Sequence, residues 1–233
     1  MSDSMTIQSH KGPYSVYFQA DALETLNASE NDNIHFIIDQ QVADLYANRM
    51  KNILNSSSVL LLEANEHSKS LDRFPAYIDA LVANGIRRDH TLFAIGGGVI
   101  QDITCFLGAT MLRGVDWKFL PTTLLSQADS CIGSKSSINT GSTKNILGTF
   151  TPPQEIFIST DFLNTLDNRE IFSGVGEILK VHAIDGPSSF DQIAEDYELL
   201  FSNSDVMVNY IRRALSIKLD YIEEDEFDQG PRN

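Results

Sequence analysis

The chain is poor in basic residues. It has 17 lysines and arginines against 32 aspartates and glutamates, so its 233 residues carry a formal net charge of −15. A chain of this charge repels nucleic acids and anionic membranes, and we expect neither as a partner. An anionic substrate would instead need a local cluster of cations within the acidic background.

Cysteines and long apolar segments are also scarce. Cys105 and Cys131 have neither the paired spacing of a zinc knuckle nor the density of a disulfide scaffold, which favours a reducing compartment. The polar stretch 1–13 lacks the apolar core of an export signal, and no later stretch is long enough to span a bilayer. We therefore expect a cytoplasmic protein.

What the chain does have is a regular alternation of short apolar runs and amphipathic stretches. The runs at 34–39, 59–63, 91–95, 117–120 and 156–158 are typical of buried strands. Helices are predicted between them, including one that runs from Leu71 to the stop signal Asn84-Gly85 and one over 99–112. This alternation predicts an α/β fold, a Rossmann-like and mostly parallel sheet with helices on both faces.

After about residue 165 only helices are predicted. They cover 169–184, 189–200 and 205–224, and the last of them places Met207, Ile211, Ala214 and Ile222 near one face. We therefore expect two domains, an α/β domain over 1–165 and the first helices of an all-α domain over 166–233.

The first motif with chemical potential is GGGVIQD at 96–102, which follows a predicted strand and opens a predicted helix. Glycines let the backbone approach a pyrophosphate closely, and the N-terminus of the helix supplies free N–H groups and a positive dipole end. A strand-to-helix turn that merely needs glycine is the alternative. The position between a strand and a helix favours a cofactor site.

The second motif combines PTTLLSQADS at 121–130, GSK at 133–135 and TKN at 143–145. Its hydroxyls, carboxylate, amide and two lysines suit the phosphate and hydroxyl groups of an anionic polyol. An ordinary polar loop is the alternative.

The third motif is SGVGEILK at 173–180, which places Glu177 and Lys180 on one helix face. The two side chains would either enter a cleft or form a simple surface ion pair.

Together these motifs closely resemble 3-dehydroquinate synthase and its sugar-phosphate cyclase relatives, in the same order and at the same separations. The resemblance covers nearly the whole chain. It rests on GGGVIQD, RGVDWKFLPTTLLSQADS, GSKSSIN, TKNILGTF and SGVGEILK, with support from EHSKS at 66–70 and DEFDQGPR at 225–232.

The resemblance implies a site for each group that such an enzyme handles. NAD would be held by Asp39, Glu66, Lys69, Gly97, Gly98, Val99, Asp102, Thr122, Thr123, Lys144, Phe162, Leu163, Asn164 and Thr165. The substrate, a phosphorylated sugar acid, would be held by Arg113, Asp129, Lys135, Asn145, Lys180, Lys218 and Arg232. Glu177 would be a ligand of a divalent metal, zinc or cobalt, and a homodimer is expected.

The reaction implied is the closure of a carbocycle from a heptulosonate phosphate, a step in aromatic amino acid biosynthesis. Family members oxidise a ring alcohol with tightly held NAD, eliminate phosphate, reduce the ketone again and complete an intramolecular aldol step. The metal acidifies the hydroxyl that loses hydride, and cations stabilise the departing phosphate.

The sequence departs from the family pattern at several points. Gln101, Ser134 and Thr143 each replace a glycine, and none of the five histidines lies in a region that resembles the two metal-binding histidines of the family. A catalytic zinc ordinarily keeps three protein ligands. We therefore expect the remaining ligands beyond Asn233, so that the chain is a truncated enzyme without turnover of its own, rather than one piece of a split enzyme or a degenerate relative.

Three alternatives stay open. Another sugar-phosphate cyclase would close a heptulose phosphate or a glucose phosphate. An iron-dependent alcohol or glycerol dehydrogenase shares the general architecture and the glycine turn, although its metal arrangement differs. A non-catalytic NAD-binding module would use the cofactor site alone.

Overall fold

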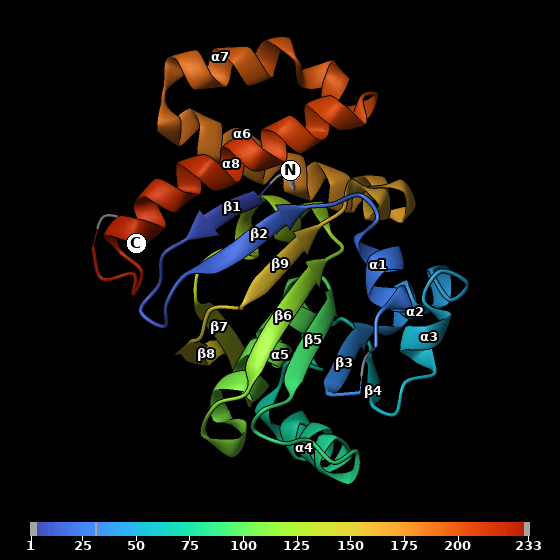
Figure 1. Ribbon diagram of the computed structural model, residues 1–233. Coiled ribbons are helices and arrows are strands. Elements are labelled where there is room, and N and C mark those ends of the chain that lie inside the picture. Colours follow the sequence, from blue (N-terminus) through green and yellow to red (C-terminus); the bar gives the residue numbers. More distant parts are fainter. Residues whose placement is uncertain (1–3, 31, 231–233) are drawn as a thin grey trace.

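A seven-stranded sheet forms the centre of the computed structural model, which describes residues 4–30 and 32–230 (Figure 1). Its order is β1 (Ser4–Ile7), β2 (Tyr14–Phe18), β9 (Glu155–Ile158), β6 (Asp116–Pro121), β5 (Thr91–Gly96), β3 (Ile34–Asp39) and β4 (Val59–Leu62). Only the β1–β2 pair is antiparallel within this sheet. The predicted mostly parallel sheet is confirmed.

The five strands predicted from apolar runs are all present, and each end lies within one residue of its predicted position. The sequence analysis did not predict β1, β2 or the hairpin of β7 (Lys135–Thr140) and β8 (Thr143–Phe150). The hairpin segment was interpreted only as a polar binding segment. Most residues of β8 are exposed, so this strand lacks the continuous apolar pattern of a buried strand.

The sheet separates two apolar cores. Along β3, Ile37 belongs to one core while Phe36 and Ile38 belong to the other, because successive side chains of a strand point to opposite faces. Helices α4 (Phe74–Ala83) and α5 (Gly98–Thr110) pack into the first core, and α1 (Ala22–Ala28), α2 (Gln40–Leu45) and α3 (Lys51–Leu54) pack into the second. Helices therefore cover both faces, as predicted.

The C-terminal ends of α4 and α5 differ in how well the sequence predicted them. α4 ends at Asn84-Gly85 as predicted, and Gly85 has a left-handed φ of 76° that favours glycine. The helix predicted over 99–112 ends earlier, at Thr110. It is followed by a short turn, η2 (Met111–Arg113), in which Leu112 and Arg113 have φ values of 53° and 68°.

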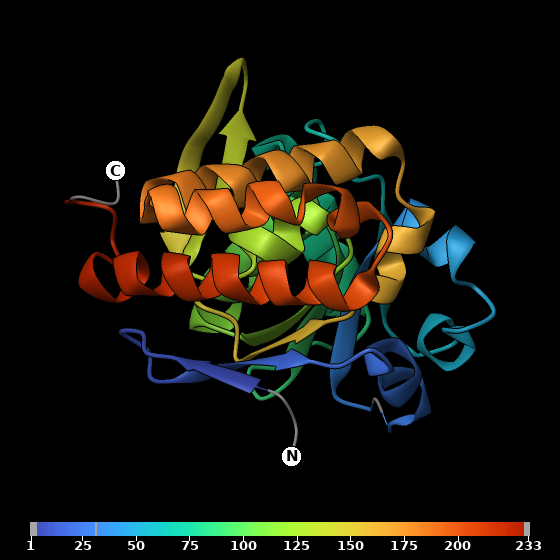
Figure 2. The same ribbon diagram turned by 90° about the horizontal axis from the view of Figure 1, so that it is seen from above.

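A helical layer lies across the carboxyl ends of the parallel strands (Figures 1 and 2). It consists of α6 (Asn168–Asp185), α7 (Pro187–Glu195), a 3₁₀ turn η5 (Tyr197–Phe201) and α8 (Ser204–Glu224). The helix predicted over 189–200 is therefore wrong in part, since it divides at Asp196 into α7 and η5. Among the described residues, no helix is both long and apolar enough to cross a membrane.

The helical layer approaches the sheet closely at one glycine. A Cβ added at Gly174 of α6 would lie 2.4 Å from Cγ of Leu124, a residue just after β6. Only glycine leaves room for this contact. Gly174 of the SGVGEILK motif thus allows α6 to pack closely against the segment after β6.

Candidate active site

A cleft of about 800 Å³ lies at the carboxyl ends of β3, β5 and β6 beneath the start of α6. Ligands of open parallel sheets commonly bind at this edge. Most of the predicted NAD-binding residues line it, namely Asp39, Glu66, Lys69, Gly97, Gly98, Val99, Asp102, Thr122, Thr123, Phe162 and Thr165. The fold therefore brings these residues from five separate segments of the chain to one cleft.

Three predicted NAD residues do not line this cleft. Lys144 lies near its edge, with Nζ 3.9 Å from Oε2 of Glu66. Leu163 is half-buried against the first core, and Asn164 is exposed, both within the turn η4 (Thr160–Thr165). A role for these three residues stays a prediction.

The glycine turn has the geometry that a phosphate needs. Gly97 is the N-cap of α5 and has no side chain to satisfy the free N–H groups that follow it. A Cβ at Gly97 would lie 2.9 Å from Cγ2 of Thr123, so only glycine lets this turn lie against the segment after β6. Free N–H groups and a helix dipole of this kind suit an anionic group such as a pyrophosphate.

Carboxylates lie along the rim of the same cleft. Asp39 ends β3, accepts a 3.0 Å hydrogen bond from the backbone N–H of Gln41, and has its pKa raised by burial. Glu170, in the first turn of α6, also lines the cleft, and burial followed by the charges of Asp167 and Asp39 raises its pKa. Glu170 was not predicted as a site residue. The one feature of the sequence that could have indicated it is its position in the first turn of a predicted helix.

A buried lysine links the cleft to the β7–β8 hairpin. Nζ of Lys69 donates to Oδ2 of Asp102 at 2.8 Å and to Oδ1 of Asn145 at 2.9 Å, and Lys69 is only 6% exposed. Asp102 also accepts from the backbone N–H of Ser137 in β7 at 2.8 Å. Burial raises the pKa of Asp102, while Lys69 acts in the opposite direction. A predicted cofactor residue and a predicted substrate residue therefore share one network.

Asp129 and Lys218 are also brought together. Asp129 lies in a π-helical turn, η3 (Ser126–Ser130), and Nζ of Lys218 in α8 donates to its Oδ1 at 2.7 Å and to its carbonyl oxygen at 2.6 Å. The ammonium group is thus held at the junction of the sheet and the helical layer. This pair joins residues from the two predicted domains.

Gln101 fastens the same π-helical turn to α5. Its Nε2 donates to the carbonyl oxygen of Ser130 at 2.5 Å, and Oγ of Ser130 donates to its Oε1 at 2.7 Å. The side chain that replaces a family glycine is therefore fully used inside the protein, where it is 5% exposed. The sequence did not predict this structural pairing of Gln101 with Ser130.

Lys135 forms an ion pair with Asp228, a residue of the loop after α8. Both line a hollow of about 460 Å³ next to the hairpin, together with Asp102, which also lines the main cleft. The two hollows therefore adjoin at Asp102. Asp228 belongs to the motif at 225–232, but no sequence pattern predicts its pairing with Lys135.

Glu177 and Lys180 form an ion pair on α6, with 18% and 59% of their side chains exposed. His182 of the same helix is fully buried, and its Nδ1 lies 2.8 Å from the carbonyl oxygen of Ile178. Among residues 4–30 and 32–230, no group of three or more histidine, cysteine, aspartate or glutamate side chains is placed to hold a metal. These residues alone do not fit a metal centre.

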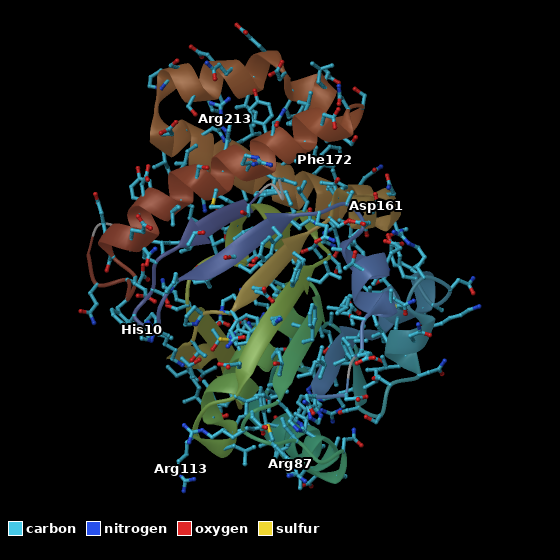
Figure 3. The ribbon with its side chains drawn as sticks, in the orientation of Figure 1. His10, Arg87, Arg113, Asp161, Phe172 and Arg213 are labelled. Atoms are coloured by element: carbon cyan, nitrogen blue, oxygen red, sulfur yellow. The ribbon has the colours of Figure 1, made fainter. Side chains whose placement is uncertain are left out.

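Arg113, a predicted substrate residue, lies away from the cleft. Arg113 lies near the amino end of β6, whereas Thr122 follows its carboxyl end, and a six-residue strand separates the two by about 20 Å. Figure 3 labels Arg113 at the end of the molecule opposite the helical layer. Arg232 lies outside the described residues. The role of each stays a prediction.

Comparison with known families gives a consistent result. The model described as 3-dehydroquinate synthase N-terminal matches residues 59–173, and the model described as 3-dehydroquinate synthase C-terminal matches residues 174–233. A 3-dehydroquinate synthase of Thermoanaerobacter pseudethanolicus is 34% identical over 99% of this chain and 68% of its own length. One of Clostridium tetani is 36% identical over 91% of this chain and 58% of its own length.

Solved structures give the same fold. A 2-epi-5-epi-valiolone synthase from Streptomyces hygroscopicus with NAD⁺ and Zn²⁺ bound has a TM-score of 0.82 and 28% identity, covering 93% of this chain and 63% of that one. A glycerol dehydrogenase from Schizosaccharomyces pombe has a TM-score of 0.55 and 22% identity over 78% of this chain and 45% of that one, which shows a related fold only. The resemblance predicted from the motifs is confirmed, and the chain belongs to the 3-dehydroquinate synthase family.

Proposed function

We propose that this chain provides the NAD site and part of the substrate site of a 3-dehydroquinate synthase, which closes a heptulosonate phosphate to a carbocycle and eliminates phosphate. The observation that supports this most strongly is the convergence of the predicted NAD residues on one cleft that adjoins the Lys69, Asp102 and Asn145 network. Bound NAD would accept hydride from the substrate and later return it.

The residues of the cleft would bind and orient the dinucleotide. The N-terminus of α5 and Gly97 would receive the pyrophosphate, since free N–H groups point out of a helix start. Asp39 would accept hydrogen bonds from ribose hydroxyls at the end of β3. Thr122 and Thr123 would add hydroxyl donors beside the glycine turn.

Cations at the junction of the two layers would hold the substrate. Lys218 keeps a fixed position because Asp129 accepts from it twice, and an ammonium group has a third hydrogen to donate. Lys135 and Lys180 would add positive charge in an otherwise acidic protein, so that charge is focused where a phosphate leaves. Asn145 would contact a substrate hydroxyl from the hairpin.

The metal is a separate part of the proposal. Glu177 would supply one ligand to zinc or cobalt, and a catalytic site needs about three protein ligands. We propose that the other ligands come from residues outside this chain and that these 233 residues bind NAD without turnover. A homodimer is proposed as well, and light scattering on the purified protein tests it.

Two assays test the function. Calorimetric titration should detect NAD binding to the chain itself, whereas phosphate release from the heptulosonate phosphate should require a longer protein with the family's complete C-terminal region. Glu177→Gln in that protein should remove bound metal and phosphate release together. Phosphate release from the metal-free 233-residue chain would contradict the assignment of the metal site.

A second candidate, another sugar-phosphate cyclase, is favoured by the similarity to 2-epi-5-epi-valiolone synthase. A panel of a heptulosonate phosphate, a heptulose phosphate and glucose 6-phosphate distinguishes the cyclases by which one releases phosphate. Production of NADH from glycerol would instead support a dehydrogenase. If the longer protein binds NAD but turns over none of these substrates, a non-catalytic NAD-binding module would be supported.

A further inference from the structure

The N-terminal hairpin, formed by β1, β2 and the residues between them, lies beside the loop 225–230 that follows α8. We call this segment the acidic loop. Figure 3 labels His10 at the turn of the hairpin, on the side of the molecule where the acidic loop descends from α8. Neither the sequence motifs nor the proposed reaction assigns a role to this hairpin.

His10 holds the acidic loop through Glu226. The backbone N–H of His10 donates to Oε2 of Glu226 at 2.8 Å, and its Nδ1 lies 2.7 Å from Oε1. The next residue of the loop, Phe227, lies between two rings, with its centroid 5.2 Å from that of His10 and 5.1 Å from that of Phe150 in β8. The loop is thus attached to the N-terminal hairpin and to the β7–β8 hairpin.

The same N-terminal hairpin holds the segment before Lys135. The hydroxyl of Tyr14 accepts from the backbone N–H of Gly133 at 2.8 Å, and Tyr14 is only 4% exposed. The backbone N–H of Thr151 donates to the carbonyl oxygen of Ser134 at 2.6 Å, and Nζ of Lys11 lies 3.4 Å from Oγ1 of Thr151. Lys135 therefore starts from a backbone that the hairpin has fixed.

These two sets of contacts meet at the ion pair of Lys135 and Asp228. Lys135 follows the segment fixed by Tyr14, and Asp228 follows the two loop residues fixed by His10. Burial acts to raise the pKa of Glu226, but hydrogen bonds from the side chain and backbone of His10, and from Ser134, lower it below its usual value. Glu226 is accordingly an ionised anchor for the loop.

We propose that the N-terminal hairpin is a positioning element of the substrate site and that His10 is a positioning residue, which keeps Asp228 of the acidic loop opposite Lys135. The role of Lys135 in substrate binding rests on the proposed function, whereas the attachment of the loop does not. A single contact between partly exposed side chains adds little to global stability, so the effect of His10 is expected in the loop and not in the fold as a whole.

Hydrogen exchange on the 233-residue chain tests the attachment. The amides of Gln229 and Gly230 donate to the carboxylate of Asp225 at 2.8 Å and report on the order of the loop. His10→Ala should speed their exchange about tenfold, as expected for loss of a hydrogen bond to a carboxylate, with an unchanged melting temperature. His10→Gln, which keeps a side-chain donor, should restore part of the protection.

Gln8→Ala is the matched control, because Gln8 lies in the same turn and is exposed. Equal exchange rates in His10→Ala and Gln8→Ala would overturn the proposal.

In the longer protein, His10→Ala should raise the KM for the heptulosonate phosphate about tenfold and leave the Kd for NAD within twofold. Faster loop exchange with an unchanged KM would show that the hairpin orders the loop without positioning the substrate site. Absence of phosphate release from the unsubstituted longer protein would instead count against the proposed function, and the exchange experiment would still decide the role of His10 in the loop.

Discussion

Replacement of Asp102 by alanine tests the connection between the NAD cleft and the hairpin. The carboxylate accepts from Nζ of Lys69 and from the backbone N–H of Ser137, both at 2.8 Å. Hydrogen bonds to charged groups contribute about 1.5–3 kcal/mol each. If Asp102 also bonds the cofactor, its loss should weaken NAD binding by about 1–3 kcal/mol, which is roughly a 5- to 160-fold rise in Kd.

The same change should lower the stability of the chain. Lys69 is buried and would keep its hydrogen bond to Asn145, but its ammonium group would lose the carboxylate that is hydrogen-bonded to it. Asp102→Asn keeps the shape and an oxygen that accepts from Ser137, and its effect on the hairpin should be smaller. Calorimetric titration measures the Kd, and thermal denaturation measures the stability.

Asp79→Ala provides the control, because Asp79 is an exposed carboxylate on α4, away from the cleft. This variant should bind NAD with the affinity of the unsubstituted chain. An unchanged Kd in a folded Asp102→Ala variant would refute the assignment of Asp102 to the cofactor. It would leave the carboxylate with a structural role only.

Further predictions concern packing and ionisation. Gly174→Ala should destabilise the fold by about 1–3 kcal/mol, because the new Cβ would meet a leucine. Gly176→Ala should melt no lower than the unsubstituted chain, because its new Cβ would meet no atom within 4 Å beyond its own helix backbone and chain neighbours. The pKa of Tyr210 is raised to about 12 by burial and by Asp196, so stability should fall as the pH rises from about 10 towards 12, and Tyr210→Phe should flatten this fall in pH-dependent urea titrations. Burial raises the pKa of Cys105 to about 11 and that of Cys131 to about 12, so a thiol reagent at pH 8 should modify neither before unfolding and both after it.

The parallel strands could be predicted because burial on both faces leaves a continuous apolar signature. β3 and β5 have this signature, and their predicted limits agree with the structure to within one residue. The β7–β8 hairpin could not be predicted in the same way. Its residues are largely polar, and its position depends on contacts such as that of Ser137 with Asp102, 35 residues away in the sequence.

The candidate site shows the same division. The glycine turn at Gly97 could be predicted because its neighbours in sequence, a strand and a helix, are also its structural context. The pairing of His10 with Glu226 joins residues 216 positions apart, and no local pattern encodes it. For Arg113 the motif could be recognised locally, but its distance from the cleft could not. Arg113 lies before the amino end of β6, whereas the cleft lies at the carboxyl end of the same strand.

The π-helical turn at Ser126–Ser130 limits how this family member can change in length. The backbone N–H of Cys131 donates to the carbonyl oxygen of Ser126, five residues earlier, so the turn contains one residue more than an α-helical turn. Deletion of one residue there would rotate Asp129 by about 100° around the helix axis and away from Lys218. Insertions and deletions that preserve function should therefore be confined to places such as the exposed tip at Gly141, where the spacing of the site residues is not encoded.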